Sequence, residues 1–170
     1  VEVGEAYSDD DRSSFTAAAA SLQRHSADVR GKAVAFSRTL GLPQTVADDV
    51  ALAAWLHDVG KVDPRFQMLL AGGDEVRLAA LVEPQAKSRL PNMSASRWRR
   101  VAEHAKLPEG YRHELASLAM IERDPEVRAR AHDLDLVLHL VASHHGWCRP
   151  FAPAVPTSTD GLSPSLSFQL

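Results

Sequence analysis

The spacing of the apolar residues constrains this chain more than any other feature, because it follows the helical period from residue 22 onward. The first stripe has steps of three, four and seven residues, which place its members on one face of a helix: Leu22, Val29, Ala33, Phe36 and Leu40. Similar spacing, bounded by Gly, Pro and Asp, predicts further helices over about 43–58, 63–72, 74–82, 112–123 and 134–145. No segment alternates with period two, so the sequence predicts an all-α fold.

The length of 170 residues is that of one ordinary domain, which we place at residues 15–151. Residues 1–14 are acidic and polar and are expected to form a linker or flexible N-terminus, and the Pro-, Ser- and Thr-rich residues 152–170 an extended segment. Within the domain, residues 84–111 are interrupted by prolines and are expected to be irregular apart from one helix around Trp98.

Composition excludes several classes of protein. With 45% apolar and 24% charged residues the chain is not disordered, and its single cysteine excludes a disulfide framework. No apolar run approaches the roughly 18 to 20 residues that cross a bilayer, so we expect no membrane contact and a cytoplasmic location.

The eight histidines point to a metal site of imidazole and carboxylate ligands. Residues of these types lie at four places on inner faces or ends of the predicted helices: His25, His57 with Asp58, His113, and His144 with His145. A single histidine on an apolar face is more often a hydrogen-bonded core residue, but four such places together favour ligands. Adjacent residues diverge by about 100° on a helix, so two doublets fit a dinuclear cluster better than one ion, with Asp58 as the bridging carboxylate.

Charge is distributed unevenly along the chain, although its formal net value is only -3. Seven basic residues face only two acidic ones within residues 87–112: Lys87, Arg89, Arg97, Arg99, Arg100, Lys106 and Arg112 against Glu103 and Glu109. Such a segment can bind a phosphate backbone, or it can simply be a solvated helix face.

Four blocks of sequence resemble the HD nuclease domain of CRISPR type I effector helicase-nucleases. They are HSADV (25–29), HDVGKVDPRFQ (57–67), GYRHELASL (110–118) and VASHHGWCRPF (141–151), and they occur in the order found in that family. The stretch QAKSRLP (85–91) and the RPF after the double histidine look most like the I-G subtype, in which the HD domain follows the helicase. That arrangement would also explain a chain without an initiator methionine.

The resemblance implies an HD-domain helical bundle with a dinuclear site, and it assigns roles residue by residue. The implied metal ligands are His25, His57, Asp58, His113, His144 and His145. Lys61 matches a lysine expected to meet the phosphate, although a solvent-exposed lysine is the alternative. Arg65 and Gln67 match the family's RFQ and would orient phosphate or water. Glu114 would orient a ligand imidazole or form an exposed ion pair.

The implied cofactors are two divalent transition-metal ions, namely manganese, nickel, cobalt or iron rather than zinc or magnesium. The implied catalytic residues are Asp58 and Lys61, and basic residues would bind the nucleic acid: Arg65, Arg97, Arg99, Arg100 and Arg112. The family usually adds a last aspartate from a helix beyond the double histidine, but here only Asp160 follows, in a segment rich in Ser, Thr and Pro. We therefore expect the closing helices to be missing from this chain.

The function implied is hydrolysis of single-stranded DNA in CRISPR interference, with a helicase domain in cis or in trans and an RNA-guided surveillance complex as partners. Two alternatives remain open. One is an HD phosphohydrolase of nucleotides or cyclic dinucleotides, in which a glutamate and a GYP element would normally follow the double histidine instead of Gly146 and Trp147. The other is a catalytically silent docking domain.

Overall fold

A computed structural model describes residues 19–88, 90 and 94–146, and helices dominate this part of the chain. The expected linker 1–14, the extended segment 152–170 with Asp160, and Arg89 lie outside the described residues. The longer helices are α2 (Leu22–Thr39), α3 (Gln44–Leu56), α6 (Ala95–His104), α7 (His113–Arg123) and α9 (Leu134–Ser143). Shorter elements lie between them: the 3₁₀-helix η1 (Val59–Val62), α4 (Pro64–Leu70), α5 (Glu75–Ala79) and α8 (Pro125–Arg130). The prediction of an all-α fold is confirmed.

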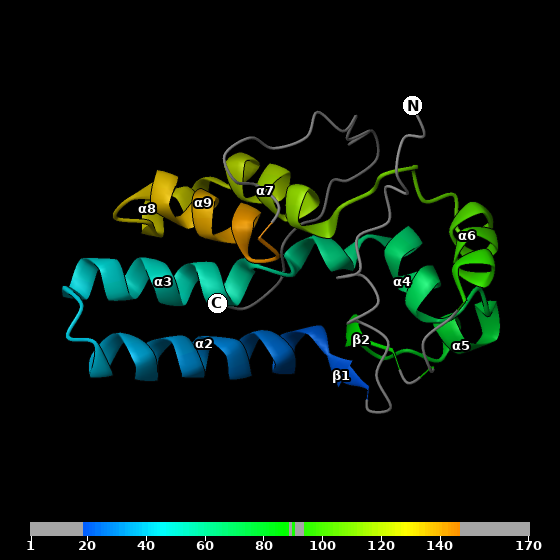
Figure 1. Cartoon of the computed structure of the whole chain (residues 1–170), viewed down its shortest axis with the longest axis horizontal. Coiled ribbons are helices and arrows are strands. Elements are labelled where there is room, and N and C mark those ends of the chain that lie inside the picture. Colours follow the sequence, from blue (N-terminus) through cyan, green and yellow to red (C-terminus); the bar gives the residue numbers. More distant parts are fainter. Residues whose placement is uncertain (1–18, 89, 91–93, 147–170) are drawn as a thin grey trace.

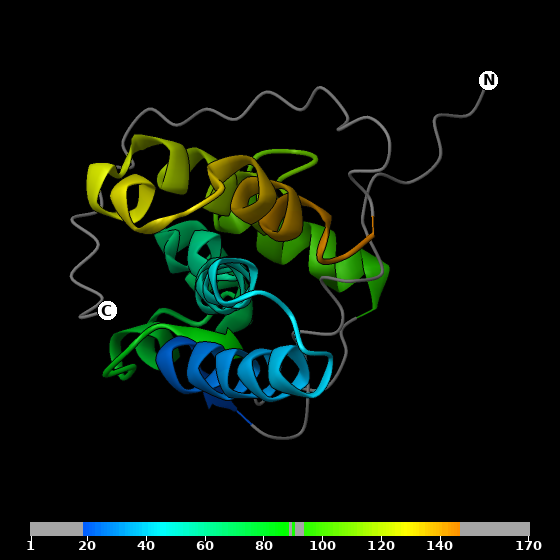
Figure 2. The ribbon, with the colours of Figure 1, turned by 90° about the vertical axis from the view of Figure 1, so that its left-hand side faces the viewer.

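Helix α3 forms the middle layer, with α2 on one side and α7, α8 and α9 on the other (Figures 1 and 2). Its apolar residues Leu52, Ala53 and Leu56 pack with residues of the opposite helices, among them Ile121, Val127, Val137 and Val141. Burial of each such aliphatic side chain stabilises the fold by about 1.5–3 kcal/mol. Because α3 is covered on both sides, the residues at its C-terminal end enter the interior of the protein.

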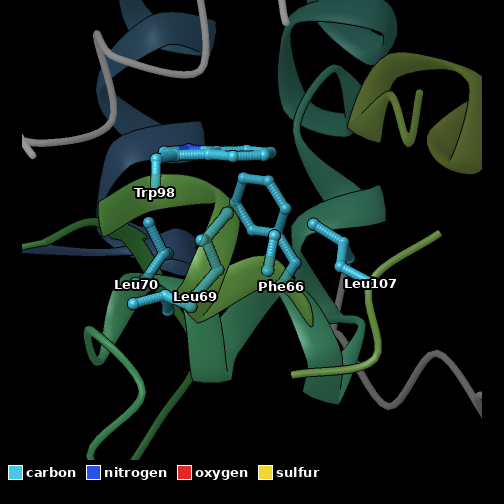
Figure 3. Packing of buried hydrophobic residues seen from close by; sticks show 7 residues of the cluster. Phe66, Leu69, Leu70, Trp98 and Leu107 are labelled. Carbon is cyan, nitrogen blue, oxygen red and sulfur yellow. The ribbon is translucent and has the colours of Figure 1, made fainter. Parts of the chain in front are cut away.

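A second hydrophobic cluster joins α4 to α6 at the other end of the molecule (Figure 3). Phe66, Leu69 and Leu70 on α4 pack with Trp98 of α6 and with Leu107. The predicted helix around Trp98 is therefore confirmed, and its buried apolar face explains it. This cluster holds α4, and with it the loop after α3, against the rest of the protein.

The sequence-based assignment of the buried face of α2 is wrong in its second half. Phe36 and Leu40 are 67% and 72% exposed, whereas Ser26 and Ser37 are buried. Periodicity identifies a stripe, but the partner helix decides which stripe is buried, and α3 meets the side of α2 that carries the small serine side chains. Helix α3 is buried around more of its circumference than a single stripe would be, because Asp49, Ala51 and Leu52 are buried as well as Ala53 and Leu56.

Two short elements were not predicted. Helix α8 begins with Asp124 as N-cap and Pro125 at its first position, directly after the predicted helix 112–123. A two-stranded antiparallel sheet pairs β1 (Ala20–Ser21) with β2 (Gln85–Lys87). The sheet corrects the expectation that residues 84–111 are irregular outside the Trp98 helix.

No described helix is both long and apolar enough to cross a bilayer.

Candidate metal centre

The end of α3 places His57 and Asp58 at the centre of the molecule. His57 is the C-cap of α3, and Asp58 then leaves helical geometry with φ -104° and ψ 5° as the chain enters η1. Because the two residues are adjacent but only one of them is helical, their side chains approach the same region from different directions. The Asp58 side chain is 2% exposed.

Gly60 allows η1 to pack directly on α7. A Cβ atom at this position would lie 2.1 Å from the His113 carbonyl oxygen and 2.6 Å from the Ser117 backbone nitrogen. The close approach lets the Gly60 amide donate to Ser117 Oγ at 2.8 Å and lets the Tyr111 hydroxyl donate to the Gly60 carbonyl at 2.9 Å. The glycine therefore bounds the predicted helix 43–58 and also brings Asp58 next to His113.

The side chains of five histidines surround the Asp58 carboxylate in two groups. Asp58 Oδ2 lies 3.4 Å from Nε2 of both His25 and His57, which form with it the outer group. Asp58 Oδ1 lies 3.2 Å from His113 Nε2 and 3.7 Å from His144 Nε2. With His145, whose Nε2 is 3.0 Å from that of His113, these residues form the inner group.

Within each group the potential ligand atoms lie within 4.8 Å of one another. Asp58 is the residue that both groups share, and it faces them with different oxygens. All six residues expected as ligands are thus brought together around one carboxylate, in two groups that could each hold a metal ion.

Hydrogen bonds to backbone carbonyls set the tautomers of two of these histidines. Nδ1 of His57 lies 2.8 Å from the Ala54 carbonyl oxygen, and Nδ1 of His144 lies 2.7 Å from that of Val141. A carbonyl oxygen only accepts, so Nδ1 carries the proton in both rings and Nε2 presents a lone pair to Asp58. Histidines that coordinate metals through one ring nitrogen commonly donate the other ring N–H to a carbonyl or carboxylate oxygen in this way.

The lone pair of His144 tests whether the centre suits a metal ion. His144 Nε2 is buried and has no hydrogen-bond partner within the described part of the chain. It faces a carboxylate oxygen, which is also an acceptor, and a buried acceptor without a donor is costly. A divalent cation between these atoms satisfies both, so the residues present fit such an ion.

The protonation states favour metal binding at neutral pH. Burial lowers the pKa of His144 to about 4, and burial likewise lowers the pKa of His25 despite the opposing effect of Asp58. The positive charges of Lys61 and Lys87 add to the lowering at His25. Both imidazoles are therefore neutral at pH 7, the form that coordinates cations.

Asp58 remains ionised although it is buried. Burial by itself raises the pKa of this carboxyl, but the neighbouring Lys61 ammonium and a hydrogen bond from His113 outweigh it and hold the pKa well below its ordinary value. Lys61 Nζ lies 2.9 Å from Asp58 Oδ2, and the lysine is only 4% exposed. The alternative of a solvent-exposed lysine is therefore wrong.

Gln67 and Arg65, expected to act on phosphate or water, are engaged within the protein. The Gln67 amide donates to the carbonyl oxygens of Lys61 and Gln85 at 2.6 and 2.9 Å, and its oxygen accepts from the Gln85 amide. Arg65 forms a two-point ion pair with the buried Asp63, through Nε to Oδ1 at 3.0 Å and through the terminal nitrogen to Oδ2 at 2.6 Å. These contacts favour structural roles: Gln67 holds the backbone of Lys61, and Arg65 supports the start of α4.

The other basic residues expected to bind nucleic acid do not belong to either ligand group. Arg97, Arg99 and Arg100 are exposed on α6, and Arg112 pairs with Glu114. Glu114 is buried, which excludes the exposed ion pair, and its Oε2 lies 3.8 Å from His113 Nδ1. The three histidines without a motif role, His104, His132 and His139, are exposed and outside both groups.

Sequence reasoning missed Asp49, which supports the helix that carries the double histidine. The two oxygens of this buried carboxylate accept from the backbone amides of His132 and Asp133, both at 2.8 Å. They fix the connection into α9, and so the position of His144. The local sequence does not distinguish the buried Asp49 from its exposed neighbour Asp48, so no signal in the sequence identifies this role.

The family model described as "Cas3, HD domain" matches residues 13–161, which is most of the chain. Searches of curated proteins and of solved structures gave no significant match. The matched region contains the described helices and all six candidate ligands, and the chain therefore belongs to the Cas3 HD-domain family of CRISPR-associated HD proteins, which implies a metal-dependent hydrolase.

Proposed function

We propose that this domain hydrolyses phosphodiester bonds of single-stranded DNA with two divalent transition-metal ions, manganese, nickel, cobalt or iron, that share Asp58. The observation that carries the proposal is the division of the six ligands into two groups with Asp58 common to both. When bound, such ions activate water and stabilise the charge that develops on phosphate oxygens.

The residues of the chain supply the rest of the chemistry. His57 and His144 hold their protons on Nδ1 and keep Nε2 free to coordinate. Lys61, next to Asp58, provides a positive charge that can meet the phosphate once the carboxylate is neutralised by metal. Arg97, Arg99 and Arg100 remain candidates for contacts with more distant phosphates, because they are exposed on one helix.

The partners proposed are a helicase domain, in cis or in trans, and an RNA-guided surveillance complex, all within the prokaryotic cytoplasm. Membership of the Cas3 HD family supports them. Sequence selection would then reside in the guide RNA, so the nuclease itself needs no base-specific contacts.

The test is cleavage of circular single-stranded DNA by the purified chain after loading with Mn²⁺, Ni²⁺ or Co²⁺. We expect cleavage that EDTA abolishes and that the Asp58→Ala variant lacks. Parallel assays with nucleoside triphosphates and cyclic dinucleotides identify the substrate. Faster turnover of either would replace the proposal with the phosphohydrolase alternative. A loaded chain that cleaves nothing, even with a helicase present, would be a docking domain.

A further inference from the structure

A groove of about 1150 Å³ opens beside the outer group of the metal centre. It runs between the beginning of α2, the small sheet and α5, which Figure 1 shows at the same end of the molecule. His25, a member of the outer group, forms part of its wall together with Arg24, Arg77 and Lys87. A linear molecule in the groove would thus lead directly to the metal ligands.

Strand geometry turns Lys87 toward this groove. Side chains alternate along β2: Ala86 is fully buried, whereas Gln85 and Lys87 are partly exposed and line the groove. Ser88 again points inward, and its hydroxyl donates to the Leu70 carbonyl at 2.6 Å. Antiparallel pairing of Lys87 with Ala20 then places the lysine beside the first turn of α2.

Two cations of the groove are not neutralised within the described part of the chain. Neither Lys87 nor Arg24 has a carboxylate within 4.0 Å there. Arg77 is only loosely paired with Asp74, at 3.9 Å, and both side chains are about half exposed. Two carboxylates, Asp28 and Glu83, also line the groove without pairing to these cations.

The apolar part of the wall suits unpaired bases better than a duplex. Leu81 and Val82 line the groove, and Val82 is completely exposed. The flat faces of unstacked bases are largely apolar and can pack on such side chains, while bases within a duplex are inaccessible.

From this geometry we infer that Lys87 and Arg24 bind non-scissile phosphates of a single strand whose neighbouring phosphate lies at the metal centre. The inference rests on the proposed function and adds to it the path of the substrate. It assigns to the QAKSR segment a binding role: Gln85 and Ser88 hold the strand β2, and Lys87 projects from it.

The test measures binding without cleavage, in EDTA, by fluorescence anisotropy of a labelled oligothymidylate with the full chain. Replacing one phosphate-binding cation lowers the slope of log K against log salt by about 0.7, which corresponds to about five-fold weaker binding at about 0.1 M salt. We expect this effect for Lys87→Gln and for Arg24→Gln, and retention of binding in Lys87→Arg. Matched controls are Lys32→Gln and Arg38→Gln, exposed cations of α2 that do not line the groove, and circular dichroism checks that all variants fold.

The outcomes separate the inference from the proposed function. If the wild-type chain binds the oligonucleotide and Lys87→Gln and Arg24→Gln bind equally well, the groove inference is overturned and the proposed function stands. Equal weakening in the two control variants also overturns it, because binding is then non-specific. If the wild-type chain neither binds nor, with metal, cleaves single-stranded DNA, the proposed function fails and the inference fails with it.

Discussion

The inner and outer ligand groups share one carboxylate but differ in the structure that supports them. The inner histidines come from α7 and α9, whose residues Ile121, Val137 and Val141 are fully buried against α3. The outer His25 comes from α2, where Leu22 is the buried aliphatic residue and the other buried positions are serines. His113 is 1% exposed, compared with 22% for the His25 side chain.

This difference indicates that the two halves of the centre have unequal rigidity. Ligands on helices held by a dense apolar core keep their geometry before an ion arrives, and preorganisation increases affinity. The outer group lies beside an open groove, through which we propose that the substrate reaches the centre. We expect the inner group to bind its ion more tightly.

The largest effect is expected from removing the residue that joins the groups. Asp58→Ala takes a ligand from both and leaves the buried Lys61 ammonium without its carboxylate. Removing a residue that merely hydrogen-bonds to a metal ligand costs about 10–100-fold in metal affinity or activity. Because Asp58 is itself a proposed ligand, we expect its loss to lower activity by more than about 100-fold. Metal analysis should find less than one ion per chain. Normal occupancy would show that Asp58 is not a shared ligand.

The next largest effect is expected from disturbing the close contact between Gly60 of η1 and the backbone of α7, which brings Asp58 next to His113. Gly60→Ala drives a Cβ atom into the His113 carbonyl, and overpacking against backbone should cost about 3 kcal/mol or more. Urea unfolding measures this loss. Gly31→Ala is the control, because nothing lies within 4 Å of its Cβ, and alanine in a helix should be neutral or stabilising by up to about 1 kcal/mol. Similar stability of the two variants would contradict the close packing at Gly60.

Single-ligand variants separate the two halves. His25→Gln should weaken only the looser of two Mn²⁺ binding phases in calorimetry, by about 100-fold, while His144→Gln should weaken the tighter one by a similar factor. In His25→Gln one ion per chain should remain bound. Loss of both ions in this variant would mean that the two groups do not bind ions independently. It would contradict the expected difference in affinity between the inner and outer groups.

The smallest effect is a dependence of stability on pH in the metal-free protein. His144 has a pKa of about 4 when folded and an ordinary value of 6.5, so between these values the unfolded chain binds a proton that the folded chain does not. The free energy of unfolding therefore decreases as pH falls from 6.5 to about 4, by roughly 2–3 kcal/mol at about 1.4 kcal/mol per pH unit. Urea titrations from pH 7.5 to 4.5 should show the decrease, and His144→Gln should reduce it. If stability depends on pH just as strongly in that variant, the effect arises from another group. His25 is then the candidate, because its pKa is also lowered in the folded protein.

Metal affinity should also decrease as pH falls, because protons compete with metal ions for the imidazole nitrogens. We expect occupancy and activity to fall below about pH 6.5. A flat profile from pH 8 to 5 would argue against histidine ligation.

Much of this structure could be predicted where local signals are strong. The stripe Leu134, Val137 and Val141 predicts α9 and places His144 at its end, as found. The start of α8 was predictable in principle, since Asp124 accepts from the amides of Glu126 and Val127 in the usual manner of an N-cap, but we did not use that signal. The exposure of Phe36 was not predictable, because a helical stripe does not reveal where the next helix will lie.

Periodicity, capping residues and short motifs are local signals, and they were sufficient to predict most of the helices, the candidate ligands and the family. Three features follow only from the packing of helices and the pairing of strands: which oxygen of Asp58 faces which histidines, the burial of Lys61 beside it, and the place of Lys87 in the same groove as His25. These relations join residues from 3 to more than 80 positions apart. They depend on how whole helices pack, which no local pattern of residues specifies.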